Sequence, residues 1–125
     1  MQRYFNRIKS LVDRYATMPF VLDVALHFES RPGDQGYLTG ELIFVDGSQL
    51  HFREFLDSVE GNVEKLMYTY HYQSIDTTLI FRYDNALHRP TLPSLEHKHS
   101  SHGIQLHFSP VLEDVLLEVV ESKSW

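Results

Sequence analysis

The sequence predicts an α+β fold: an antiparallel β-sheet of about five or six strands in meander order, flanked by an N-terminal and a C-terminal helix. Apolar residues recur at helical spacing near both ends, alternate with polar residues between the ends, and fall into runs separated by short turns. The chain has 125 residues, of which 42% are hydrophobic. This size suits one domain, 1–125, with a single core.

The two terminal helices are predicted from apolar stripes at three- and four-residue intervals. The first stripe consists of Tyr4, Ile8, Leu11, Val12 and Tyr15. Pro19 lies beyond it and prevents a smooth continuation. The last stripe consists of Val111, Leu112, Val115, Leu116, Val119 and Val120. Ser109 is expected to cap this helix, with Pro110 in its first position.

Between the helices the apolar period changes to two, which is typical of strands with one solvated face. The predicted strands cover residues 20–29, 37–45, 49–52, 66–72, 79–83 and 104–108. Asp46-Gly47 favours a tight type I′ hairpin, and a short helical or irregular piece is expected at 55–59. Tyr68, Tyr70 and Tyr72 share a strand face with Leu66, so core packing is favoured over base stacking.

Composition excludes several classes of protein. With no cysteines, the chain has no disulfide framework or thiolate zinc site. It contains no membrane-length apolar run or signal-peptide core, so we expect a cytoplasmic protein that does not enter membranes. A net charge of −6 argues against a broad surface for nucleic acid but permits a local RNA site.

Residues 82–102 do not resemble scaffold, because they lack regular alternation and contain Pro90 and Pro93. They hold half of the eight histidines: His88, His97, His99 and His102. Arg82, Arg89 and Lys98 accompany them. We interpret the segment as a loop of about twenty residues, longer than most connections, and such loops are usually functional or mobile. His71 could join it from the polar face of its strand, whereas His27, His51 and His107 are given no role.

Three interpretations of this segment stay open. Histidines can exchange protons with a phosphodiester while arginine or lysine stabilises the developing charge, and RNA supplies its own 2′-hydroxyl as nucleophile. Alternatively, His97 and His99 could bind a metal with Asp84 and with His88 or His102. The third interpretation is structural, with surface histidines in a turn-rich loop.

Three short strings carry a family resemblance. They are Tyr70-His71-Tyr72-Gln73, Phe81-Arg82-Tyr83-Asp84-Asn85-Ala86 and Glu96-His97-Lys98-His99. The chain resembles the TumE family, described as the toxin half of toxin–antitoxin modules and typically encoded beside a helix-turn-helix antitoxin. Leu87 stands where the family pattern has proline, and Arg89 stands where it has a second histidine.

The resemblance implies a growth-inhibiting toxin, and we hypothesise a metal-independent endoribonuclease that needs no cofactor. His88 and either His97 or His99 would form the acid–base pair, and Asp84 would orient a histidine. Arg82 and Lys98 would contact the phosphate. The residues assigned to substrate binding are His71, Tyr83, Asn85 and Arg89. RNA is the candidate substrate, and a helix-turn-helix antitoxin is the expected partner. The alternatives are a non-catalytic protein-binding module and a metal-dependent enzyme built on the histidines.

Overall fold

The computed structural model describes residues 1–85 and 96–125, and within them it confirms the α+β class. One helix, α1 (Gln2–Ala16), precedes the strands along the chain, and a second, α2 (Leu112–Lys123), follows them. The strands are β1 (Val21–Arg31), β2 (Gln35–Phe44), β3 (Gln49–Val59), β4 (Asn62–Gln73), β5 (Leu79–Asp84), β6 (His97–Ser100) and β7 (Gly103–Leu106). They form one antiparallel sheet in the order β1 to β7, so the predicted meander is confirmed with seven strands.

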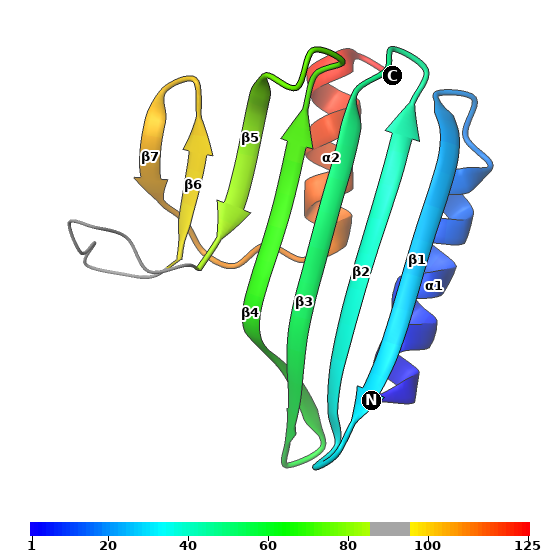
Figure 1. Ribbon diagram of the computed structural model, residues 1–125, viewed down its shortest axis with the longest axis vertical. Coiled ribbons are helices and arrows are strands. Elements are labelled where there is room, and N and C mark those ends of the chain that lie inside the picture. Colours follow the sequence, from blue (N-terminus) through cyan, green and yellow to red (C-terminus); the bar gives the residue numbers. More distant parts are fainter. Residues whose placement is uncertain (86–95) are drawn as a thin grey trace.

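Both helices cover the same face of the sheet (Figure 1). The core lies between the helices and that face, which we call the helix-facing side. It receives alternate residues of each long strand, including Tyr68, Tyr70 and Tyr72, which are 0–1% exposed. The preference for core packing of these tyrosines is therefore confirmed. Within residues 1–85 and 96–125, no helix covers the opposite face, which we call the open face.

The C-terminal residue, Trp125, closes one end of the core. Its ring stacks on Phe20 at a centroid distance of 5.1 Å and lies 5.2 Å from the ring of Phe44. Its backbone N–H donates to the carbonyl oxygen of Val120, at the end of α2. The end of α2 is thereby joined to β2 and to the segment that precedes β1.

A buried acidic residue, Glu54, lies on the helix-facing side of β3 at 1% exposure. Its carboxylate accepts hydrogen bonds from the hydroxyls of Tyr4 and Tyr70. Lys65 donates to the Tyr70 hydroxyl at 2.8 Å and to the carbonyl of Pro110. Burial lowers the pKa of Lys65, although Glu54 acts in the opposite direction. This polar cluster connects α1, the sheet and the segment before α2.

The hairpins differ from prediction in two places. Residues 55–59 continue β3 instead of forming a helical or irregular piece, so β3 and β4 make one long hairpin. Its turn, Glu60-Gly61, has two positive φ angles, 51° and 79°, as a type I′ turn requires. At the predicted type I′ turn, only Gly47 has positive φ, and the Gly47 N–H bonds to the Phe44 carbonyl. That pattern is a three-residue hairpin loop with glycine in the left-handed position.

Three predicted core positions are exposed. The first turn of α2 begins at Leu112 and not at Pro110, so Val111 is the N-cap and is 57% exposed. A register shift between Val21 and Asp23 leaves Leu22 outside the core. A similar shift opposite Phe55 turns Leu66 outward and brings Lys65 to the helix-facing side. These irregularities break the two-residue period on which the predictions rest.

Candidate functional site

The open face carries a row of polar side chains that crosses five strands. The pairing register places these residues opposite one another in the order Glu41, His51, His71, Arg82 and His99. Residues paired in this way have side chains on the same face. A second row, two residues along the strands, contains His27, Thr39, Arg53, Thr69, Asp84 and His97. Most of the histidines in the described strands therefore meet on one surface, including His27 and His51, which were given no role.

Asp84 is the centre of the densest part of this surface. Its carboxylate accepts hydrogen bonds from the Arg82 Nε at 2.7 Å and lies 2.5 Å from the His97 Nε2. The His99 Nε2 is 3.7 Å from the same carboxylate. Asp84 and His97 are buried, at 3% and 0% exposure, whereas the side chain of His99 is 21% exposed. The buried Asp84 carboxylate thus positions Arg82, His97 and His99 from the neighbouring row of the same face.

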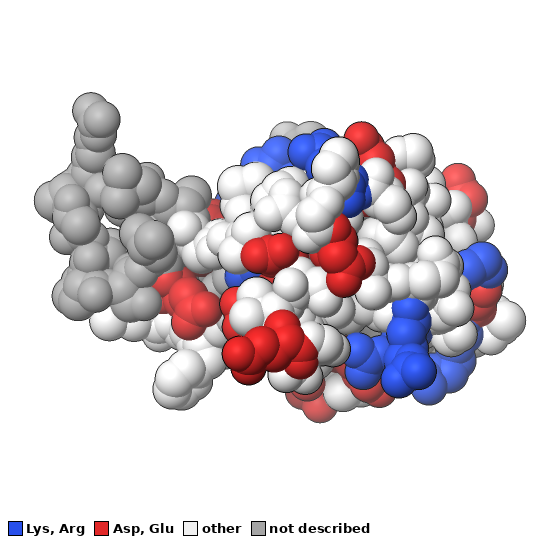
Figure 2. Space-filling view, turned by 90° about the horizontal axis from the view of Figure 1, so that it is seen from below, with Lys and Arg blue, Asp and Glu red and all other residues white. Residues whose placement is uncertain are grey.

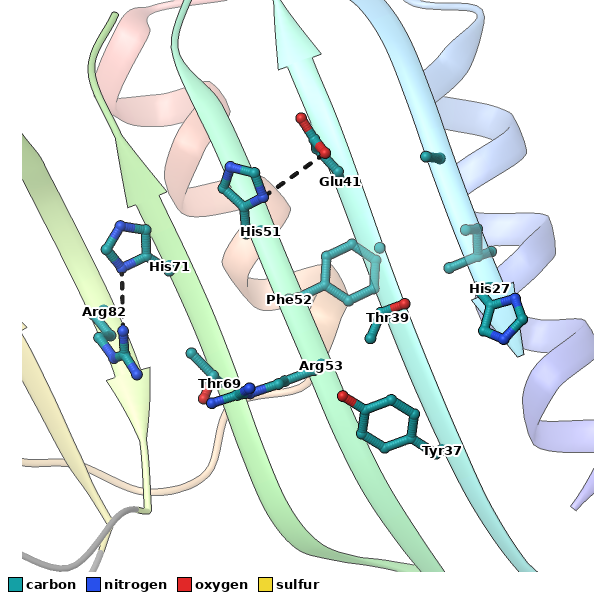
Figure 3. Close-up of a pocket in the computed structure, with 13 residues that line it drawn as sticks. His27, Tyr37, Thr39, Glu41, His51, Phe52, Arg53, Thr69, His71 and Arg82 are labelled. Atoms are coloured by element: carbon teal, nitrogen blue, oxygen red, sulfur yellow. Dashed lines mark hydrogen bonds and ion pairs between the residues drawn. The ribbon is translucent and has the colours of Figure 1, made fainter. Parts of the chain in front are cut away.

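His71 lies on the other side of Arg82. Its Nδ1 is 3.5 Å from an Arg82 terminal nitrogen (Figure 3). Its Nε2 contacts the side-chain oxygen of Gln73 at 3.0 Å. Burial lowers the pKa of His71, and the positive charge of Arg82 acts in the same direction. The imidazole is therefore neutral near pH 7 and can accept a proton.

A shallow groove of about 610 Å³ extends from Arg82 across the open face toward β1. The polar side chains that line it come from five neighbouring strands: His27, Tyr37, Thr39, Glu41, His51, Arg53, Thr69, His71 and Arg82 (Figure 3). The sequence analysis did not identify Tyr37, Glu41 or Arg53 as site residues. Their alternation with buried neighbours placed them on a polar face, but only the strand register shows which residues meet there.

Two of the predicted site residues, Tyr83 and Lys98, lie on the helix-facing side and do not join the histidines. The Tyr83 hydroxyl donates to the Glu118 carboxylate at 2.6 Å, and the Lys98 ammonium lies 2.8 Å from its other oxygen. Burial acts to lower the pKa of Lys98, but the hydrogen bonds to Glu118 and Tyr83 raise it overall. These contacts attach α2 to β5 and β6.

Asn85 has a local structural role. Its side-chain oxygen accepts from the Tyr68 backbone N–H at 3.1 Å, and its amide donates to the Leu66 carbonyl at 3.0 Å. Leu66 is the extra residue of the irregularity in β4, and Tyr68 follows it by two residues. Asn85 therefore satisfies backbone groups at the place where the strand pairing is interrupted. The remaining predicted site residues, His88 and Arg89, lie outside the described residues.

The geometry is also compatible with a metal ion. Asp84, His97 and His99 each offer one ligand atom, and these atoms lie within 4.8 Å of one another. Two imidazoles and a carboxylate on one side of an ion are a recurring set for iron and zinc. The fold thus brings together three residues of the predicted metal set, whereas His88 lies outside the described residues and His102 is exposed in the turn after β6.

The fold and site together define a small α+β protein with a histidine, arginine and aspartate site on the open face of a meander sheet. The chain matches the family described as Toxin TumE over residues 8–123, and it belongs to the TumE family. It is therefore the toxin of a toxin–antitoxin module, with an antitoxin as partner.

The other comparisons add no relative. Neither the curated proteins nor the solved structures gave a significant match. Within the described residues, no helix has the length and apolar character needed to cross a membrane.

Proposed function

We propose that this toxin inhibits growth by cleaving RNA without a metal ion, using His71 and His99 as the acid–base pair around Arg82. The observation that carries the proposal is the register His71–Arg82–His99 across three adjacent strands. Adjacent strands are about 4.8 Å apart, so the two histidine backbones are separated by roughly 10 Å. A phosphate on the Arg82 guanidinium would then have one imidazole on each side.

The chemistry follows from the protonation of the two histidines. Neutral His71 removes the proton of the 2′-hydroxyl, whose oxygen attacks the neighbouring phosphorus. The bond from phosphorus to the 5′-oxygen breaks, and His99, paired as an imidazolium with Asp84, donates the proton that this oxygen needs. Arg82 stabilises the charge on the phosphoryl oxygens. His97 and Asp84 are positioning residues, because both are buried in the neighbouring row and the Asp84 carboxylate contacts Arg82, His97 and His99. The product is a 2′,3′-cyclic phosphate.

The test is cleavage of RNA by purified protein in a chelator. We expect cyclic phosphate ends and a rate that rises and then falls with pH around neutrality. His71→Ala, His99→Ala and Arg82→Ala should each lower the rate by roughly 10²–10⁴-fold. His102→Ala is the matched control, because His102 is exposed in the turn between β6 and β7. Unchanged rates in the three variants, with the fold intact by circular dichroism, would contradict the proposal.

A second candidate, a metal-dependent nuclease, is supported by the three converging ligands Asp84, His97 and His99. Such an enzyme would be inactive in chelator and would regain activity with zinc or manganese. Titration calorimetry should then show a metal site that His97→Ala abolishes. Cleavage in chelator together with no metal binding would eliminate this candidate. No cleavage under any condition, with tight antitoxin binding, would favour a non-catalytic binding module.

We also propose that the antitoxin is a helix-turn-helix protein and that the pair acts in the cytoplasm. The support is the family resemblance of the three sequence strings and a proposed RNA target, which is located there. Co-expression with the product of a neighbouring helix-turn-helix gene should restore growth and yield a co-purifying complex. If growth is restored only by a neighbouring gene product that has another fold, the proposal of a helix-turn-helix antitoxin is wrong.

A further inference from the structure

The open face carries a pair of aromatic residues two rows along the strands from the row that contains His51 and His71. Tyr37 of β2 is paired with Phe55 of β3, and both rings are partly exposed there. The Arg31 guanidinium lies over both rings, 5.1 Å from the Tyr37 centroid and 5.5 Å from that of Phe55. An arginine above two aromatic rings on a sheet presents flat surfaces on which unpaired bases can stack.

Arg53 lies between the aromatic pair and the proposed catalytic row. It is exposed, and its side chain extends across β4 toward Thr69 within the groove (Figure 3). Among residues 1–85 and 96–125 it makes no ion pair or side-chain hydrogen bond. A cation without a carboxylate partner in a polar groove is suited to a phosphate group.

The spacing fits an extended strand of nucleic acid. Arg53 is two strands and one row away from Arg82, and the aromatic pair is one row further. With rows about 6.8 Å apart and strands about 4.8 Å apart, Arg53 is roughly 12 Å from Arg82. The distance from Arg82 to the aromatic pair corresponds to about four nucleotides. This length is at the lower end of the site sizes of small β domains that bind single strands.

We propose that the open face binds single-stranded RNA, with Arg53 on a phosphate remote from the cleaved one and Tyr37 and Phe55 stacking a base. The proposal rests on RNA cleavage at Arg82 for the position of the scissile phosphate. Stacking on these rings requires unpaired bases, which excludes a duplex. Seen from below, acidic and basic side chains are both present, and the described part of that surface has no continuous cationic coat (Figure 2). A local groove accounts for RNA binding by a chain of net charge −6.

The binding test uses a labelled single-stranded RNA of about ten nucleotides and fluorescence anisotropy. To prevent cleavage, all measurements are made in the His99→Ala background. Adding Arg53→Ala, or Tyr37→Ala with Phe55→Ala, should weaken binding at least fivefold, about the loss expected for one stacked base. Arg53→Ala should also reduce the slope of log affinity against log salt by about one. A duplex of the same sequence should compete poorly.

Two matched controls are available. Arg3→Ala removes an exposed arginine from α1, and Phe108→Ala removes an aromatic ring that is 88% exposed after β7. Neither should change RNA affinity. Unchanged affinity in the Arg53 and aromatic variants would overturn the inference. If those variants instead lost binding to the antitoxin, the open face would be assigned to the protein partner.

Substrate length separates this inference from cleavage itself. A dinucleotide occupies only the His71–Arg82–His99 region, so Arg53→Ala in otherwise native protein should leave its cleavage unchanged. With a longer RNA the same variant should raise KM at least fivefold with little change in kcat. Cleavage that is equally sensitive to Arg53 for both substrates would refute the remote contact. If native protein cleaves neither substrate but the binding losses remain, the proposed catalysis fails and the binding face stands.

Discussion

The charge state of His71 connects the proposed chemistry to the stability of the fold. Burial lowers the pKa of this imidazole, and the nearby Arg82 and His51 act in the same direction, against the hydrogen bond that the ring donates to Gln73. In the unfolded chain a histidine takes up its proton near pH 6.5. As the pH falls through that value, the unfolded chain binds the proton before the folded protein does. Folding therefore becomes less favourable toward acid.

This difference predicts the pH dependence of a variant. His71→Asn removes the titrating group, so its melting temperature should fall less than that of the native protein between about pH 7.5 and pH 5. Thermal unfolding followed by circular dichroism at the two pH values provides the comparison. His102→Asn, which changes an exposed turn residue, should retain the native difference. If the melting temperature falls equally in the native protein and the His71 variant, the environment of His71 does not contribute to the loss of stability in acid.

Glu54 makes a second prediction at the residue scale. Two tyrosine hydroxyls donate to its buried carboxylate, and Lys65 is hydrogen-bonded to one of them. Glu54→Ala should lower the free energy of unfolding by about 3–5 kcal/mol, because two tyrosine hydroxyls lose their acceptor and the partly buried Lys65 ammonium loses the strongest of the negative charges that act on it. Glu29→Ala, at an exposed site on β1, should change it by less than about 0.5 kcal/mol. Chemical denaturation measures both, and a loss below about 1 kcal/mol for Glu54 would show that water replaces the carboxylate easily.

At the scale of elements, α2 illustrates how one helix divides between core and solvent. Leu116 is 0% exposed and Leu117 is 46% exposed, although they are neighbours of the same residue type. Leu116→Ala should cost about 2–5 kcal/mol of unfolding free energy, whereas Leu117→Ala should cost much less. Urea denaturation of both variants measures the two losses. Because both substitutions remove the same side-chain atoms, a difference between them reflects burial alone. Similar losses at the two positions would indicate that α2 is not packed through the predicted stripe.

The helices and strands themselves were largely predictable, because the spacing of apolar residues along the sequence follows the helical or the strand period. The bulges were not, since one extra residue at Leu22 or Leu66 reverses the side on which the following side chains lie. The β3–β4 turn was missed for a related reason. Its first residue, Glu60, adopts positive φ without belonging to the residue types that favour it.

Some residues of the candidate site were predictable, but its geometry was not. The strings that resemble the family contain Arg82, Asp84, His97 and His99, and the fold brings these four together. Interpreted as a loop, their segment offered no reason to separate Lys98 from its neighbours. In fact β6 is a strand, and its two-residue alternation sends Lys98 to the opposite face.

At the scale of the whole molecule, the sheet separates stabilising contacts from the proposed chemistry. Lys98→Met breaks the ion pair with Glu118 and should lower the melting temperature while leaving RNA cleavage unchanged. His99→Ala should lower the rate of cleavage by roughly 10²–10⁴-fold and leave the melting temperature nearly unchanged, because its partly exposed ring is not in the core. Both variants need only a melting curve and a cleavage assay. Loss of cleavage activity in a stable Lys98→Met protein would instead support the predicted contact of Lys98 with the phosphate.

The position of Trp125 gives the protein a built-in optical signal. It is the sole tryptophan, and its indole is held between Phe20 and Phe44 at the end of α2. Its fluorescence emission therefore reports whether the C-terminal helix is seated on the sheet, with a shift to longer wavelength when water reaches the indole. Because this reporter lies on the helix-facing side, it registers loss of packing without being quenched directly by a ligand on the open face.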